Sequence, residues 1–116
     1  MKILIVDDNT DAADSLAVLL ALQGHETRVA YGARVALRMN FEFEPSLLIS
    51  DIRMPQMSGL ELAREIRRHN ADQPVLAALS GDDLPEDQQA ALEAGFDHFF
   101  AKPLEVHRLE AMIAAL

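Results

Sequence analysis

Residues 3–8 read Ile-Leu-Ile-Val-Asp-Asp, an apolar run without alternation that stops at two carboxylates. Such a run predicts a central strand of a parallel sheet that helices cover on both faces. Leu47–Ile49 and Val75–Leu79 have the same character, whereas Thr27–Ala30 alternates and is expected nearer an edge. The first run is too short for a signal-peptide core or a membrane span.

Short apolar runs alternate with longer amphipathic stretches along the whole chain, which predicts repeated βα units. The expected strands are Ile3–Val6, Thr27–Ala30, Ser46–Ser50, Val75–Leu79 and His98–Ala101. Five helices are expected; four have clear end signals: a cap at Asn9 or Thr10 with Gly24 beyond the end, Ser58 before a helix followed by Pro74, Pro85 to Gly95, and Leu104 to Leu116. Because βαβ crossovers are right-handed, we expect one α/β domain over residues 1–116, with an open doubly wound parallel sheet.

The amino-acid composition and net charge of the chain argue against some classes of function. Half of the 116 residues are hydrophobic, so the chain can bury one compact core. Lys and Arg number 10 against 19 for Asp and Glu, and the formal net charge is −9. This balance disfavours direct binding to nucleic acid or to an anionic membrane. The sequence has no cysteine, which excludes disulfides and thiolate metal sites, and we expect a cytoplasmic protein without membrane insertion.

Polar residues follow four of the expected strands at their carboxyl ends. Asp7 and Asp8 end the first strand, Asp51 ends the third, Ser80 ends the fourth and Lys102 follows the fifth. In a doubly wound sheet these ends border the functional crevice. Clustered carboxylates repel each other unless a cation compensates them. Oxygen ligands without histidine or cysteine favour Mg²⁺.

Five segments make the sequence resemble one family, the receiver domains of two-component response regulators. They occur in the family's order and spacing and cover essentially the whole chain: residues 3–9 (ILIVDDN), 51–59 (DIRMPQMSG), 78–81 (ALSG), 94–97 (AGFD) and 99–103 (FFAKP). The resemblance implies a flavodoxin-like five-stranded sheet with strand order 2-1-3-4-5. The segments at residues 7–16 and 94–98 further resemble receivers attached to hybrid sensor histidine kinases.

The resemblance also assigns roles. It implies that Asp51 is the phosphoacceptor and that Asp7, Asp8, Asp51 and the backbone carbonyl of Arg53 surround Mg²⁺. Ser80 and Lys102 would hold phosphoryl oxygens. Phosphotransfer by this route needs charge neutralisation and alignment more than proton chemistry, and a carboxylate needs no activating base. The four histidines, which fall away from the carboxyl ends of the strands, are interpreted as ordinary surface or half-buried side chains: His25, His69, His98 and His107.

The implied function is a phosphorelay switch and not a conventional enzyme. A sensor histidine kinase or histidine phosphotransfer protein would phosphorylate Asp51, and the chain would catalyse only this transfer and a slow autodephosphorylation. Ser80 would then move toward the phosphoryl group, Phe99 would turn inward, and the surface around it would change its affinity for an output domain or target protein. A phosphorylation-dependent homodimer is compatible with this mechanism.

Three further residue roles are expected. The resemblance implies a cis peptide bond before Pro103, which would direct Lys102 to the pocket. Gly59 allows a backbone conformation closed to bulkier residues. Arg53 and Asp82, which carry opposite charges near the pocket, are predicted to attract each other and to prolong the phosphorylated state by restricting water.

Other functions were weighed against this one. A haloacid dehalogenase-type phosphotransferase needs a second acid two residues after the nucleophile, where this chain has Arg53, and there is no room for a cap domain. Flavin or nucleotide binding lacks its glycine-rich motifs. A phosphorylation-independent interaction module usually lacks a pocket residue, and here none is missing.

Overall fold

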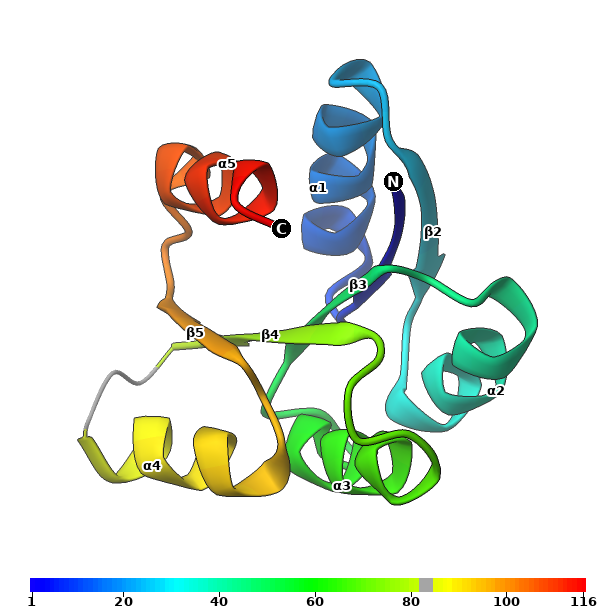
Figure 1. Cartoon of the computed structure of the whole chain (residues 1–116). Helices are drawn as coiled ribbons and strands as arrows, with labels where there is room; N and C mark the ends of the chain where they lie inside the picture. Colours follow the sequence, from blue (N-terminus) through cyan, green and yellow to red (C-terminus); the bar gives the residue numbers. More distant parts are fainter. Residues whose placement is uncertain (82–84) are drawn as a thin grey trace.

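Strands and helices alternate along the chain (Figure 1). The computed structural model describes residues 1–81 and 85–116. The elements are β1 (Lys2–Val6), α1 (Thr10–Leu22), β2 (Glu26–Ala30), α2 (Ala33–Phe43), β3 (Leu47–Asp51), α3 (Gly59–His69), β4 (Val75–Ser80), α4 (Pro85–Ala94), β5 (His98–Ala101) and α5 (Val106–Ala114). Within the described residues, no helix has both the length and the apolar character needed to cross a membrane.

The strands form one parallel sheet in the order β2-β1-β3-β4-β5. This confirms the doubly wound α/β prediction, including the edge position of β2. The order reverses at β1, which pairs with both β2 and β3. All five residues of β3 are buried, as expected for a central strand between two helical layers. The functional crevice of such a sheet lies at the carboxyl ends of β1 and β3.

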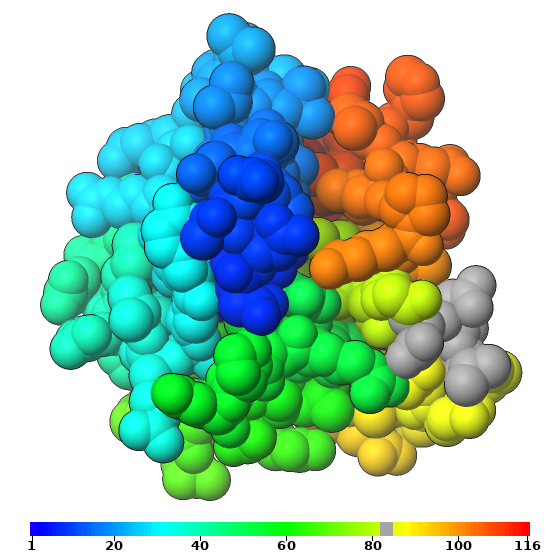
Figure 2. Space-filling view, turned by 180° about the vertical axis from the view of Figure 1, so that it is seen from behind, coloured from blue at the N-terminus to red at the C-terminus, as the bar shows by residue number. Residues whose placement is uncertain are grey.

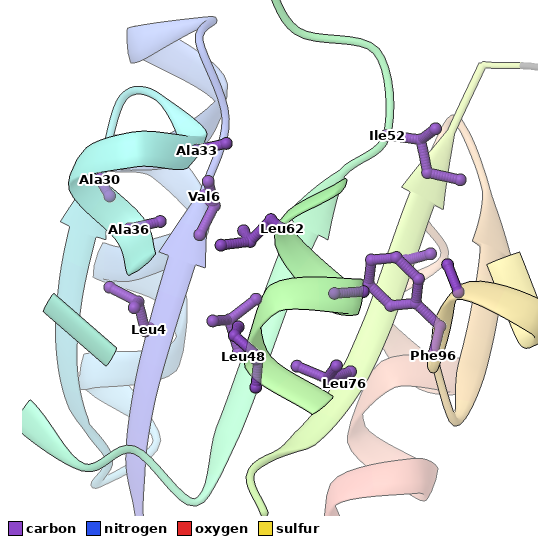
Figure 3. Close-up of a cluster of buried hydrophobic side chains, with 14 of the residues drawn as sticks. Leu4, Val6, Ala30, Ala33, Ala36, Leu48, Ile52, Leu62, Leu76 and Phe96 are labelled. Carbon is purple, nitrogen blue, oxygen red and sulfur yellow. The ribbon is translucent and has the colours of Figure 1, made fainter. Parts of the chain in front are cut away.

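The helices cover the sheet in two layers, with α1 and α5 on one face and α2, α3 and α4 on the other (Figure 1). Alternate residues of β1 contact opposite layers: Ile3 and Ile5 pack beneath α1 and α5, whereas Leu4 and Val6 pack beneath α2 and α3. Figure 3 shows the core cluster on the face covered by α2, α3 and α4, in which Phe96 extends the core toward α4. Because helices bury both faces of these strands, the strand sequences do not alternate between apolar and polar residues.

Side-chain hydrogen bonds cap the first turns of α1 and α3. The Asn9 side chain accepts a hydrogen bond from the Ala12 backbone N–H at 3.1 Å and caps α1. Ser58 and Glu61 form a reciprocal capping box at the start of α3. These contacts fix where each helix leaves the crevice, and they place the β1–α1 and β3–α3 loops beside the carboxyl ends of the strands.

The last helix is shorter than the predicted span from Leu104 to Leu116. It begins at Val106, because Leu104 belongs to the turn after β5 and Glu105 has extended backbone angles as the N-cap residue. It ends at Ala114, and its buried residues are Leu109, Met112 and Ile113. Sequence patterns define helix ends poorly, which accounts for the difference from the predicted span.

Arg67 on α3 turns toward the α4–β5 connection, and its side chain is only 14% exposed. Its Nε donates to the Gly95 carbonyl at 3.1 Å, and its Nη2 lies 2.8 Å from Asp97 Oδ2. The same carboxylate oxygen accepts from the Leu76 backbone N–H at 2.9 Å. Arg67 therefore ties α3 to β4 and to the start of β5.

Replacing Arg67 with alanine is expected to lower the free energy of unfolding by about 1–3 kcal/mol, because Asp97 and the Gly95 carbonyl would lose charge-assisted donors in a half-buried setting. Urea denaturation measures this loss. The control is Arg68→Ala, since the Arg68 side chain is 70% exposed in its pair with Glu65. Equal losses in the two variants would contradict a structural role for Arg67.

Candidate functional site

Three carboxylates meet at the carboxyl ends of β1 and β3. Asp7 and Asp8 follow β1 directly, and Asp51 is the last residue of β3. One oxygen from each carboxylate lies within 4.8 Å of the other two. Asp7 and Asp51 are 4% and 8% exposed, whereas Asp8 is exposed. Figure 2 shows this side of the molecule, where the blue segment near the start of the chain borders the green middle segment and the orange segment that contains Lys102.

Lys102 brings the opposite charge to this cluster. Its Nζ lies 3.3 Å from Asp51 Oδ2 and 3.8 Å from Asp7 Oδ2. Its backbone N–H donates to the Ser80 carbonyl at 2.7 Å, which holds the start of the β5–α5 loop against β4. The peptide bond between Lys102 and Pro103 is cis, as is the one between Gln73 and Pro74. One ammonium group cannot balance three carboxylates, so the cluster keeps an excess of negative charge.

The orientation of Asp7 is set by its own loop. Its Oδ1 accepts a hydrogen bond from the Asn9 backbone N–H at 3.0 Å, and its other oxygen faces Lys102. The Asp7 backbone N–H donates to the Ala30 carbonyl at 3.1 Å, which extends the pairing of β1 with β2. The role of Asn9 in fixing this carboxylate was not foreseen from the sequence, where only its capping role had a signal.

Burial raises the pKa of the Asp51 carboxyl above its ordinary value, and the neighbouring Asp7 carboxylate raises this pKa further. Lys102 and the Ile52 backbone N–H oppose this rise by favouring the ionised form. The raised pKa means that ionising Asp51 costs more free energy in the folded protein than in the unfolded chain. A bound cation would remove part of this cost.

The cluster suits a hard divalent cation. Its three carboxylates supply oxygen ligands alone, which is the donor set that Mg²⁺ and Ca²⁺ prefer, and their oxygens are close enough to share one ion. The described part of the chain shows no other group of this kind. Asp7, Asp8 and Asp51 can therefore hold a metal ion.

Ser80 and Phe99 lie on the strands beside the cluster. Ser80 is 2% exposed at the end of β4, and its neighbour Leu79 pairs in register with Asp51. Phe99 pairs in register with Ala78, and its half-buried ring packs against the core cluster beneath α2, α3 and α4. Ser80 and Phe99, the expected switch pair, therefore lie on adjacent strands. The residue that pairs with Phe99 is two positions before Ser80 on β4.

Gly59 begins α3 directly against the backbone that follows Asp51. A Cβ at this position would collide with the Asp51 carbonyl oxygen and would lie 3.0 Å from Ile52 Cα. The Gly59 backbone N–H donates to the Ile52 carbonyl at 2.8 Å. Gly59 is therefore needed for close approach of the helix to the site, and not for an unusual backbone angle.

Replacing Gly59 with alanine is expected to lower the free energy of unfolding by about 1–3 kcal/mol, because the added methyl group must push α3 away from Asp51. Chemical denaturation tests this prediction. Gly81→Ala is the matched control, since a Cβ there meets nothing within 4 Å among the residues that the structure describes, and its change should stay within about 0.5 kcal/mol. A neutral Gly59→Ala would show that the helix moves without cost.

The predicted pair of Arg53 with Asp82 cannot be followed, because Asp82 lies outside the described residues. Within the described residues, Arg53 has a contact that the sequence did not suggest: its Nη2 is 3.9 Å from Asp87 Oδ1 on the first turn of α4. The four histidines lie away from the acidic cluster, in the α1–β2 turn, on α3, on β5 and on α5, and each is exposed or half-buried as predicted.

Comparison with known proteins agrees with this geometry. The family model of the response regulator receiver domain matches residues 3–114. The chain belongs to this family. Receiver domains are the phosphorelay signalling modules of two-component systems, so the prediction made from the five sequence segments is confirmed.

Two curated relatives of this receiver domain illustrate the match. The response regulator MprA of Mycobacterium avium is 34% identical over 116 residues, and that of Mycobacterium leprae is 35% identical. Each alignment covers 100% of this chain and 50% of the relative, so the chain spans about half the length of these proteins.

Solved structures give the same fold. A response regulator receiver protein from Pseudomonas putida superposes with a TM-score of 0.89 at 29% identity, covering 99% of this chain and 96% of that one. A CheY-like receiver domain protein from Methanospirillum hungatei gives a TM-score of 0.90 at 29% identity, covering 98% and 90%. The receiver fold therefore extends over nearly all of this chain.

Proposed function

We propose that Asp51 accepts a phosphoryl group from a phosphohistidine on a sensor histidine kinase or a histidine phosphotransfer protein. The observation that supports this most is the buried Asp51 carboxylate, held 3.3 Å from the Lys102 ammonium inside the acidic cluster. A carboxylate oxygen of Asp51 would attack phosphorus, forming a P–O bond as the P–N bond breaks. The electron pair of that bond returns to the imidazole nitrogen, which takes up a proton from solvent.

The residues that would hold Mg²⁺ are Asp7, Asp8 and Asp51 through their carboxylates, and Arg53 through its backbone carbonyl. When bound, Mg²⁺ supplies positive charge that offsets the carboxylates and the phosphoryl oxygens. Lys102 would donate to one phosphoryl oxygen, and the Ser80 hydroxyl would donate to another. Lys102 also favours the ionised form of Asp51, which is the form that attacks.

The signal would leave the site through Ser80 and Phe99. Once a phosphoryl group provides a new acceptor, Ser80 moves toward it and makes room for the Phe99 ring to turn inward. The α4–β5–α5 surface then shifts its population between two shapes, and a partner that prefers one shape is recruited or released. Hydrolysis of phospho-Asp51 by water, catalysed weakly by the same site, would reset the switch.

Residues 1–116 would act as one receiver unit. Because the chain spans half of its curated relatives, its output is proposed to be either a domain of the same longer protein or a separate target. A phosphorylation-dependent homodimer through the α4–β5–α5 surface would be a further way of passing on the signal. A phosphorylation-independent interaction module remains the rival that the following experiment excludes or supports.

Intact-mass spectrometry tests the proposal. With Mg²⁺ and acetyl phosphate, or with a phosphorylated histidine kinase, the protein is expected to gain one phosphoryl group, and chelation by EDTA should prevent the gain. Borohydride reduction followed by peptide mapping should place the modification at Asp51. Absence of uptake from both donors would refute the phosphoacceptor role and favour the interaction module.

A further inference from the structure

The loop between β1 and α1 joins the acidic cluster to the start of a helix. Because β1 ends at Val6 and α1 begins at Thr10, this loop consists only of Asp7, Asp8 and Asn9. The two aspartates belong to the acidic cluster. Each residue has only two soft backbone dihedral angles, so a loop this short passes a shift at one end on to the other. The first turn of α1 and the carboxylates of the site are therefore not placed independently.

Asn9 is hydrogen-bonded toward both ends of this connection. On the side of the site, its backbone N–H donates to Asp7 Oδ1 at 3.0 Å. On the side of the helix, its side-chain Oδ1 accepts from the Ala12 backbone N–H at 3.1 Å, and its carbonyl oxygen accepts from the Ala13 backbone N–H at 3.0 Å. A rotation of Asn9 that breaks the cap of α1 consequently also displaces the N–H that holds Asp7.

The Asp7 carboxylate depends on such a donor for its orientation. Asp7 is 4% exposed, so water solvates its carboxylate poorly. Its Oδ1 receives the Asn9 N–H, and its Oδ2 lies 3.8 Å from Lys102 Nζ. Hydrogen bonds to a ligating carboxylate orient it for a metal ion, and their loss weakens metal binding. If the Asn9 N–H is displaced, the attraction of Lys102 gains influence over the carboxylate, and this ammonium competes with a cation for it.

We propose that Asn9 is a positioning residue that couples the first turn of α1 to the metal affinity of the acidic cluster. While its side chain caps α1, its backbone N–H holds Asp7 in the orientation that binds Mg²⁺. This inference rests on the proposed function, in which Asp7 is one of the residues that hold Mg²⁺. The coupling is reciprocal, so binding of Mg²⁺ favours the capped turn. A partner that unwinds the first turn of α1 would lower the metal affinity and, with it, the rate of phosphorylation.

An NMR titration of the unphosphorylated protein with MgCl₂ tests this coupling without any phosphodonor. Asn9→Ala removes the cap and is expected to raise the dissociation constant of Mg²⁺ about three- to tenfold. The effect is smaller than that of deleting a partner of a metal ligand outright, because the backbone N–H at residue 9 remains but is held less firmly. Asn9→Ser keeps a side-chain oxygen that caps helices well, and it should bind Mg²⁺ as the wild type does.

The matched control is Ala21→Gly. Ala21 is exposed in the last turn of α1, far along the helix from Asn9, and glycine there weakens the helix by an amount similar to the loss of a cap. This variant should keep the wild-type affinity for Mg²⁺. Unchanged affinity in Asn9→Ala, equal weakening in Ala21→Gly, or failure of Asn9→Ser to match the wild type would each overturn the proposal.

Amide hydrogen exchange measures the same coupling from the side of the helix. Saturation with Mg²⁺ is expected to slow exchange of the Ala13 amide about two- to fivefold in the wild type and in Asn9→Ser. In Asn9→Ala the slowing should be smaller, because the side chain that links the turn to the loop is missing. Equal slowing in Asn9→Ala would show that the Asn9 side chain does not carry the coupling.

Phosphoryl uptake, followed separately by intact mass, distinguishes this inference from the proposed function. If the wild type is phosphorylated but Asn9→Ala binds Mg²⁺ as tightly as the wild type, the inference fails and the proposed function stands. If Asn9→Ala weakens Mg²⁺ binding but no donor phosphorylates the wild type, the proposed function fails and the positioning role of Asn9 stands. A wild type whose Asp7, Asp8 and Asp51 amide signals do not respond to Mg²⁺ would refute the metal site and the inference together.

Discussion

Replacing Asp51 with asparagine is expected to abolish phosphoryl uptake while making the metal-free protein more stable. The functional loss follows because the amide oxygen is a poor nucleophile, and the other carboxylate near Lys102, that of Asp7, lies farther from Nζ, at 3.8 Å against 3.3 Å. The gain in stability follows because the substitution removes a buried charge that Asp7 repels. A gain in stability together with a loss of activity would show that Asp51 serves the function of the protein at a cost to its stability.

The pH dependence of this gain has a definite sign. Because burial raises the pKa of Asp51, the folded protein favours the protonated carboxyl. The stability that this residue contributes is present below its ordinary pKa and is lost as the pH rises through its raised pKa. The melting temperature of Asp51→Asn in EDTA should therefore exceed that of the wild type by a few degrees at neutral pH, and the difference should shrink in acid.

Differential scanning calorimetry from neutral to acidic pH measures this difference. Asp72→Asn is the control, since Asp72 is exposed in the α3–β4 loop, which enters β4 at its amino end, opposite the acidic cluster. Adding Mg²⁺ should raise the melting temperature of the wild type and reduce its difference from that of Asp51→Asn. An Asp51→Asn protein that melts below the wild type at neutral pH in EDTA would contradict the electrostatic account of the site.

The Lys102→Gln substitution is expected to slow phosphorylation by acetyl phosphate roughly 100-fold, because it removes the ammonium group that would stabilise developing charge on a phosphoryl oxygen. Its Nζ lies 3.3 Å from Asp51 Oδ2, so the loss also raises the pKa of Asp51 further and disfavours the attacking form. Single-turnover kinetics followed by intact mass would measure the rate.

Two variants control this experiment. Lys2→Gln removes the only other lysine, whose Nζ lies at the opposite end of the sheet, 3.4 Å from the Phe43 carbonyl oxygen. It should leave the rate of phosphorylation unchanged. Lys102→Arg keeps the charge with a different shape and should retain part of the rate. A rate in Lys102→Gln within a few-fold of the wild type would rule out a direct role of this ammonium.

Periodicity in the sequence was sufficient for the order of elements. The strands at Ile3–Val6 and Leu47–Ile49 are apolar without alternation because helices cover both of their faces. One sequence is therefore enough to recognise them as central strands. Helix starts at Asn9 and Ser58 were also readable, because capping is a contact between residues three apart. The start of the last helix was less readable, since Leu104 and Glu105, which precede it, are ordinary helix formers.

The sequence by itself determined which residues end the strands, and therefore that Asp7, Asp8 and Asp51 meet at one edge of a doubly wound sheet. Only the tertiary structure decided how Arg67 turns inward to Asp97, why Gly59 must lack a Cβ, and that Arg53 reaches Asp87. Each of these contacts joins elements that are distant in sequence, and it depends on where a helix settles against its neighbours. Strand ends follow from local pattern, whereas helix placement follows from the packing of the whole core.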